Sequence, residues 1–286
     1  MTSYPPALPG LSVLSRRYPA ILCDVWGVVH NGVDQHPTAV DALLTYRREG
    51  GRVVLITNAP RPAPFVIARM DELGVPHEAY DAVVSSGDAT RTLLEAFRGR
   101  TVHRVGPNYD DVLFEGLDLT LGAPEAASAV VVTDLDDGRT PADYREEMAH
   151  WLALGLPLIC ANPDKVVEEG DRLVYCGGAL ADAYEDIGGR VAMAGKPYNP
   201  IYLQAKALLD AAAGQDFARE DILAIGDSVR TDAVGAAQFG VDLLFITGSI
   251  HAEELDAFGN PDPKRVSDLV SRSRANVVGF MPRLTW

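Results

Sequence analysis

Four short polar segments each follow an apolar run of the sequence, and together they hold the groups needed to transfer a phosphoryl group. In chain order they are Asp24, Thr57-Asn58, Lys196, and Asp227 with Asp232. A carboxylate can attack phosphorus, while hydroxyl, amide and ammonium groups can stabilise the transferred anion. The remaining carboxylates provide the oxygen ligands that Mg²⁺ prefers. This set of side chains favours phosphoryl transfer through an aspartyl-phosphate intermediate.

Each segment taken alone has a simpler structural interpretation. A strand-end aspartate or a Thr-Asn pair commonly forms a turn, and Asp227-Ser228 has the composition of a helix start. An isolated lysine is most often a surface residue. We favour a shared site because all four segments occur in the same context, at the end of an apolar run.

The apolar runs alternate with helical patterns along the chain. Strands are predicted over residues 21–25, 53–56, 82–84, 102–105, 129–133, 158–160, 191–194, 222–225 and 241–246, with a last apolar stretch at 277–281. Helices are predicted over residues 36–46, 64–73, 86–97, 144–154, 179–187, 200–212 and 231–239. This alternation is typical of an α/β fold with a doubly wound parallel sheet. Ligands bind such sheets beyond the carboxyl ends of the strands, where all four polar segments fall.

Two positions are candidate domain boundaries. Gly188-Gly189 has the composition of a hinge, and a turn that contains Pro76 precedes residue 80. We therefore predict a split core domain of residues 1–80 and 188–286, with residues 81–187 forming an inserted domain.

Composition excludes several classes of partner. The 286-residue chain has a net charge of −15, which disfavours nucleic acid and anionic membranes because both are bound through Lys and Arg. The three cysteines show no CxxC spacing, so we predict reduced, buried thiols rather than a disulfide or zinc framework. Residues 1–20 lack the apolar core of a signal peptide, and no apolar run is long enough to span a membrane. A cytoplasmic location is expected.

The four segments and their surroundings resemble the haloacid dehalogenase (HAD) superfamily, in particular the NagD-like phosphatases of subfamily IIA. The stretch from Asp24 to Gly32 is similar to the first motif of that family, DxDGxLxxG, and Leu55-Ile56-Thr57-Asn58 is similar to its second. Gly195-Lys196-Pro197 resembles the third motif, and the stretch from Gly226 to Asp232 resembles the fourth, GDxxxTD. The resemblance extends over about residues 20 to 250.

The resemblance implies a Rossmann-like HAD core with an inserted α/β cap domain of the type found in subfamily IIA, and a role for each site residue. Asp24 would be the nucleophile and a Mg²⁺ ligand. The other metal contacts would come from the backbone carbonyl of Trp26 and from Asp227, while Asp232 would hold metal-bound water or Lys196. The phosphoryl group would be clamped by Thr57, Asn58 and Lys196.

The cap would select the substrate, a small phosphorylated metabolite. The loops at residues 134–139 and 162–165 are expected to face the cleft. Enzymes of this kind often pair through the cap, so a homodimer is a further expectation.

One position departs from the family pattern. The second aspartate of the first motif is the family's general acid and base, and Trp26 stands in its place. Indole cannot transfer a proton near neutral pH, and general acid–base catalysis is typically worth about 10²–10⁴-fold in rate. We therefore expect slow turnover of alkyl phosphates. His30 is a conceivable substitute, although we interpret it as a turn histidine because its spacing does not place it near the leaving group.

Two other functions remain open from the sequence. Haloacid dehalogenases also carry an aromatic residue two positions after the nucleophile, so Asp24 could attack carbon instead of phosphorus. Against this, Asp227 and Asp232 suit a cation that dehalogenation does not need. A non-catalytic metabolite-binding protein on a phosphatase scaffold is the third hypothesis, which the presence of Asp24 and Lys196 disfavours.

Overall fold

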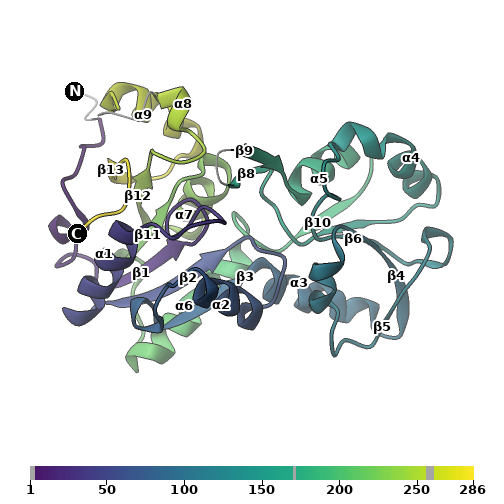
Figure 1. Ribbon diagram of the computed structural model, residues 1–286, viewed down its shortest axis with the longest axis horizontal. Coiled ribbons are helices and arrows are strands. Elements are labelled where there is room, and N and C mark those ends of the chain that lie inside the picture. Colours follow the sequence, from purple (N-terminus) through teal and green to yellow (C-terminus); the bar gives the residue numbers. More distant parts are fainter. Residues whose placement is uncertain (1–3, 170–171, 256–260) are drawn as a thin grey trace.

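The fold is built on two parallel β-sheets that lie in separate lobes (Figure 1). The computed structural model describes residues 4–169, 172–255 and 261–286. The larger lobe combines the first and last parts of the chain, and the smaller lobe is formed by the middle part. This confirms the predicted α/β class with a parallel, Rossmann-like core.

The larger sheet has six strands in the order β13-β12-β11-β1-β2-β3, all parallel. Their bounds are β1 Ala20–Asp24, β2 Arg52–Thr57, β3 Ala82–Ser85, β11 Ile222–Gly226, β12 Asp242–Ile246 and β13 Val277–Met281. Strands β2 and β3 lie on one side of β1, and strands β11 to β13 lie on its other side, so the strand order reverses between β1 and β11. Open α/β sheets bind ligands at such a position.

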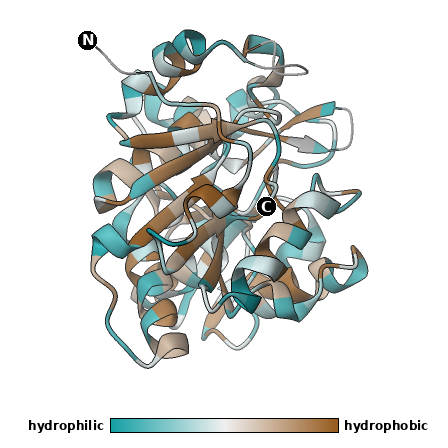
Figure 2. Ribbon diagram, turned by 90° about the vertical axis from the view of Figure 1, so that its left-hand side faces the viewer, coloured by the Kyte–Doolittle hydropathy of each residue, from teal (hydrophilic) through white to brown (hydrophobic). Residues whose placement is uncertain are grey.

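Helices cover both faces of this sheet, and alternate residues of each strand pack on opposite faces. Ile21 and Cys23 join the core on one side, with α1 and α2, whereas Ala20 and Leu22 join the core on the other, with α6, α7 and α9. Figure 2 shows the hydrophobic strands between more polar helices. The helices are α1 Pro37–Arg48, α2 Ala63–Glu72, α6 Asn199–Ala213, α7 Val234–Phe239, α8 Ala252–Leu255 and α9 Pro263–Val270. Burial on both faces explains why the strands are continuous apolar runs.

The smaller sheet has five parallel strands in the order β10-β7-β6-β4-β5. These strands are β4 Arg100–Val105, β5 Leu119–Leu121, β6 Val130–Val132, β7 Leu158–Cys160 and β10 Val191–Met193. The helices of this part are α3 Ser86–Leu94, α4 Arg145–Ala153 and α5 Gly177–Asp186. An antiparallel pair, β8 Val166–Glu169 and β9 Arg172–Tyr175, stands between the two lobes (Figure 1).

Two predictions about these elements need correction, and some elements were not predicted. The predicted inserted segment, residues 81–187, does not match the change of sheet, because β3 pairs with β2 in the larger sheet and β10 pairs with β7 in the smaller one. The helix predicted over residues 231–239 begins as a π-helical turn, Val229–Ala233, before α7. The β8–β9 pair was not predicted.

The structure bears on two predictions made from composition, the state of the cysteines and the lack of a membrane-spanning segment. Cys23, Cys160 and Cys176 are buried free thiols, as predicted. Burial raises the pKa of each of these thiols, so they are unreactive at neutral pH. Within the described ranges, no helix combines the length and the apolar character that crossing a membrane requires.

Candidate active site

The sheet order brings the predicted residues together at one edge. Strands β11, β1 and β2 are direct neighbours, and Asp24 and Thr57 are the last residues of β1 and β2. Asp227 directly follows Gly226, the last residue of β11. Lys196 reaches the same edge from the loop between β10 and α6. All four of these side chains are buried.

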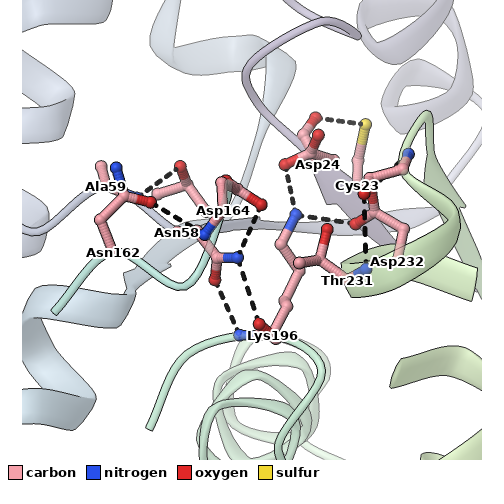
Figure 3. Close-up of polar contacts among 11 residues, drawn as sticks. Cys23, Asp24, Asn58, Ala59, Asn162, Asp164, Lys196, Thr231 and Asp232 are labelled. Carbon is pink, nitrogen blue, oxygen red and sulfur yellow. Dashed lines mark hydrogen bonds and ion pairs between the residues drawn. The ribbon is translucent and has the colours of Figure 1, made fainter. Parts of the chain in front are cut away.

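Lys196 is the centre of the polar cluster (Figure 3). Its Nζ donates to Asp24 Oδ1 at 2.5 Å and to Asp232 Oδ1 at 2.7 Å, and the lysine is only 2% exposed. The other Asp232 oxygen accepts the backbone N–H of Ser228 at 3.1 Å. Asp232 therefore holds Lys196 in place, which is one of the two roles that the resemblance implies.

The cluster contains more negative than positive charge. Asp24, Asp227 and Asp232 are buried, and one oxygen from each lies within 4.8 Å of the others. With Lys196, three carboxylates and one ammonium leave a formal charge of −2. Burial, reinforced by the charge of Asp232, raises the pKa of Asp227 to about 7 and that of Asp24 well above its usual range. Uncompensated buried charge is costly, so an all-oxygen site of this kind fits a divalent cation.

Asp227 is available to such a cation because another residue caps the helix. The Ser228 side chain accepts the backbone N–H of Thr231 at 3.4 Å, which assigns the N-cap role to the serine. The Asp227 carboxylate instead lies against Gly27, where a Cβ atom would stand 2.1 Å from Asp227 Oδ2. Gly27 has a φ of +82°, a backbone conformation that L side chains rarely adopt.

This close approach gives a first testable prediction. Gly27→Ala adds the αL penalty of about 1–2 kcal/mol and must also displace Asp227, so we expect lower stability together with weaker Mg²⁺ binding. Gly50→Ala is the matched control, because Gly50 also has positive φ but no atom within 4 Å of the position that a methyl group would take. Mg²⁺ titration followed by calorimetry should show weaker binding only for Gly27→Ala. Equal Mg²⁺ affinity in the two variants would contradict the proposed role of Asp227.

The Asn58 side chain forms hydrogen bonds with two other parts of the site, Lys196 and Asp164. Its Oδ1 accepts the Lys196 N–H at 2.7 Å, and its Nδ2 donates to Lys196 O at 3.2 Å and to Asp164 Oδ1 at 3.1 Å. Both Nδ2 protons are therefore used within the protein. A phosphate contact predicted for Asn58 would have to come from its backbone N–H. Thr57 is better placed, since its Oγ1 accepts the Ala59 N–H at 3.2 Å and keeps its own proton for a ligand.

The environment of His30 disfavours it as a replacement proton donor. The ring is 3% exposed, packs edge-on against Trp26 at 5.1 Å, and accepts the Gly32 N–H at Nδ1. Burial lowers its pKa to about 4, so it is neutral at physiological pH. This agrees with its interpretation as a turn histidine. Gly32 is required beside the indole, because a Cβ there would lie 2.5 Å from Trp26 Cζ2.

Two spaces that share part of their lining lie beside the carboxylate cluster. A small pocket of about 20 Å³ is lined by Asp24, Lys196 and Asp227, and a cavity of about 780 Å³ opens beyond it. The loops at 134–139 and 162–165, predicted to face the cleft, contribute to the larger cavity through Asp134 and Asp164, among other residues. Strand β9 also lines the cavity, with side chains that include Leu173 and Tyr175.

Asp134 and Asp164 were not among the site residues predicted from the sequence. Asp134 lies in the loop after Val132, the last residue of β6, and Asp164 lies in the loop after Cys160, the last residue of β7. Burial raises the pKa of Asp134 to about 7 and raises that of Asp164 above its usual range. The same strand-end rule would have identified them if it had been applied to the middle of the chain.

Comparisons with known proteins identify the family to which the chain belongs. A family model described as haloacid dehalogenase-like hydrolase matches residues 21–120, and one described as HAD-hydrolase-like matches residues 193–272. Among curated proteins, the chain is 27% identical over 246 residues to ribonucleotide monophosphatase NagD of Escherichia coli, covering 83% of this chain and 91% of the relative.

Solved structures extend the likeness to almost the whole chain. A haloacid dehalogenase-like hydrolase from Brucella suis is 43% identical, with a TM-score of 0.86, and covers 97% of this chain and 100% of its own. A glycerol phosphate phosphatase from Mycobacterium tuberculosis, solved with calcium, is 26% identical, with a TM-score of 0.62, and covers 83% of this chain and 68% of its own. Taken with the strand-end carboxylates and buried lysine, these matches show that the chain belongs to the haloacid dehalogenase-like family of hydrolases.

Proposed function

We propose that this hydrolase is a Mg²⁺-dependent phosphatase that acts on a small phosphorylated metabolite through an aspartyl-phosphate on Asp24. The observation that carries the proposal is the buried cluster of three carboxylates and Lys196, which lines a small pocket that shares lining residues with a larger cavity. Phosphatases among the relatives, including NagD and a Bacillus subtilis 5'-nucleotidase, support the same reaction class.

The residues divide the reaction between them. Asp24, fixed at the end of β1, attacks phosphorus, and Lys196 offsets the negative charge of the transferring group. Thr57 donates its hydroxyl proton to a phosphoryl oxygen. Mg²⁺ would be held by Asp24, Asp227, Asp232 or its bound water, and the Trp26 carbonyl. When bound, it neutralises the excess of buried carboxylate charge and polarises the phosphoryl oxygens.

The cavity is consistent with a metabolite rather than a macromolecule. Its volume of about 780 Å³ is within the common range for small-molecule sites. Arg61 and Arg69 line it together with the carboxylates Asp110 and Asp134. The non-phosphate part of the substrate would therefore contact both positively and negatively charged side chains. We infer a polar leaving group with hydroxyl or amino functions.

Attack of Asp24 on carbon is the second candidate function. It draws support from the aromatic ring at Trp26, which also lines both spaces. The buried charge excess favours the phosphatase, because a metal-free dehalogenase gains nothing from the clustered Asp227 and Asp232. Chloride release from 2-haloacids without added metal would favour carbon attack over phosphoryl transfer.

Metal dependence provides the second prediction. The wild-type protein should release phosphate from p-nitrophenyl phosphate in the presence of Mg²⁺, and removal of the metal with a chelator should abolish that release. Mg²⁺ at 100 times its dissociation constant should also stabilise the fold by about 2.7 kcal/mol, and Asp227→Asn should lose most of this gain. Full activity in the chelator, or Mg²⁺ stabilisation that survives Asp227→Asn, would contradict the proposed metal site.

Three further expectations stay predictions. The smaller lobe would act as the inserted cap, with strands β4 to β10 rather than residues 81–187 as its extent. A homodimer through this cap and a cytoplasmic location are the other two. Sedimentation of the full chain tests whether it forms a dimer. Substitution of exposed cap residues then tests whether the dimer forms through the cap.

A further inference from the structure

We propose that Asp164, which is carried by the inserted segment, is the general acid and base of this enzyme. It would do the work of the carboxylate whose position in the first motif Trp26 occupies. This inference rests on the proposed phosphatase function and assigns one further catalytic residue to the same site.

Asp164 lies between the two spaces, and this position favours it as the proton donor. The transferring phosphoryl group must lie beside Asp24 in the small pocket, and the remainder of the substrate must occupy the larger cavity. The bridging oxygen of the ester therefore lies where the two spaces meet. Among the described residues, four line both spaces, and these are Trp26, Thr57, Asp164 and Val167. Of these four, Asp164 is the residue whose side chain can act both as an acid and as a base.

Other candidates are worse placed or chemically unsuitable. The Trp26 indole is a hydrogen-bond donor but not an acid at this pH, and the Thr57 hydroxyl is too weak an acid to shuttle a proton. His30 is buried and uses Nδ1 to accept the Gly32 N–H. Asp134 lines the larger cavity and not the small pocket. Geometry therefore favours Asp164.

Several hydrogen bonds hold Asp164 in this position. Asn58 Nδ2 donates to Asp164 Oδ1 at 3.1 Å, as Figure 3 shows, and Asp164 N donates to Asn162 Oδ1 at 3.3 Å. The Asp164 carbonyl also accepts the Gly178 N–H at 3.0 Å, where α5 begins. Because Asn58 is bonded to the Lys196 backbone as well, one amide fixes the distance between the proposed acid and the lysine.

Burial and the nearby charges act in opposite directions on the pKa of Asp164. Burial raises the pKa of Asp164 above its usual range, and the positive charge of Lys196 opposes this shift. The negative charge of Asp232 also raises the pKa of Asp164. The side chain is nevertheless partly exposed, so it can exchange protons with solvent through the cavity. A carboxyl group with a raised pKa suits proton transfer close to neutral pH.

The chemical steps balance with Asp164 as the only proton carrier. Asp24 Oδ attacks phosphorus while the bond from phosphorus to the ester oxygen breaks, and the Asp164 carboxyl gives its proton to that oxygen. The products are a free alcohol, an aspartyl-phosphate and the Asp164 carboxylate. Water then attacks phosphorus and gives one proton to Asp164, so that inorganic phosphate leaves and the Asp24 carboxylate and Asp164 carboxyl are restored.

The test compares leaving groups in Asp164→Asn, an isosteric change that keeps the oxygen accepting from Asn58. Rapid-quench measurements with Mg²⁺ should show the first turnover of glycerol phosphate slowed by about 10²–10⁴-fold. The first turnover of p-nitrophenyl phosphate should change by less than about threefold, because nitrophenolate leaves without a proton. A burst of nitrophenol should follow, since water attack on the aspartyl-phosphate has lost its base.

Asp136→Asn is the matched control, because it also neutralises a partly exposed carboxylate of the larger cavity, and Asp136 does not line the small pocket. It should leave the ratio of the two first-turnover rates unchanged, whatever its effect on substrate binding. Equal slowing of both substrates in Asp164→Asn, or no slowing of glycerol phosphate, would overturn the role of Asp164 while leaving the phosphatase intact. A wild-type protein inert toward both substrates would overturn the proposed function and this inference together.

A second variant tests the same idea by restoring the missing group. In the protein that combines Asp164→Asn with Trp26→Asp, the first turnover of glycerol phosphate should recover by at least about tenfold, because a carboxyl group returns to the family position. A folded, Mg²⁺-binding double variant that remains as slow as Asp164→Asn would show that the loss was not that of a proton donor.

Discussion

Asp24→Asn is expected to reduce phosphate release by at least about 10⁴-fold, because an amide cannot form the covalent intermediate. Asp24 is 5% exposed and lies at the end of β1, so the isosteric substitution should leave the strand unchanged. It also removes one of three clustered negative charges, and Lys196 keeps its bond to Asp232. The loss should therefore appear in kcat while the free energy of unfolding stays close to that of the wild type.

Steady-state kinetics and chemical denaturation of the same preparation separate these two effects. Ser228→Ala is a useful comparison, since it removes a helix cap at the site but no group assigned to the chemistry, and should cost about 1 kcal/mol of stability. Residual activity above about one hundredth of the wild-type rate in Asp24→Asn would contradict its assignment as nucleophile.

Lys196→Met is expected to have the largest effect on stability. Removing one partner of a buried charge pair typically costs about 3–5 kcal/mol, and here Asp24 and Asp232 both lose their partner. Without Mg²⁺ the cost should be greater at pH 8 than at pH 5. Burial raises the pKa of Asp24 and Lys196 opposes that shift, so in the variant folding takes up protons at Asp24 and stability falls as pH rises. Mg²⁺ should restore part of the stability but not the activity.

Lys206→Met is the matched control for this measurement. Lys206 also contacts two aspartates, Asp210 and Asp216, but the first is partly exposed and the second is largely exposed. Surface pairs contribute about 0–1 kcal/mol, so Lys206→Met should change the free energy of unfolding by no more than that. Equal losses in the two lysine variants would show that the buried charge cluster contributes no more to stability than a surface pair.

The core fold was predictable because its strands are buried on both faces and end in polar residues. That pattern placed β1, β2 and β11, and with them Asp24, Thr57 and Asp227, at one edge of a parallel sheet. The boundary of the insertion was less predictable, since β3 and β10 are short apolar runs that fit either sheet by composition. Their partners are set by tertiary contacts that local sequence does not encode.

The roles within the site were harder to predict than its members. Asn58 was expected to contact phosphate, but its side-chain bonds to Lys196 and Asp164 link segments 106 and 138 residues apart in the sequence. Nothing in the local pattern around Asn58 indicates those partners. Asp164 carried a visible signal, an aspartate after a short apolar strand, but only the packing of the two lobes places it beside the small pocket.

The position of Asp164 bears on how substrate choice and catalysis are connected. If the proton donor comes from the inserted segment, as we propose, catalysis on alkyl phosphates requires the segment to be docked against the core. Asn58 makes this connection through one side chain, with bonds to Asp164 on one side and to Lys196 on the other.

The most direct test of the central claim is to identify the covalent intermediate. The wild-type protein would be quenched with acid during turnover of p-nitrophenyl phosphate in ¹⁸O-labelled water, and its peptides and released phosphate analysed by mass spectrometry. We predict a phosphoryl group on the peptide that contains Asp24 and ¹⁸O in the released phosphate, because water attacks phosphorus. An Asp24 peptide that takes up ¹⁸O and never carries a phosphoryl group would contradict the mechanism.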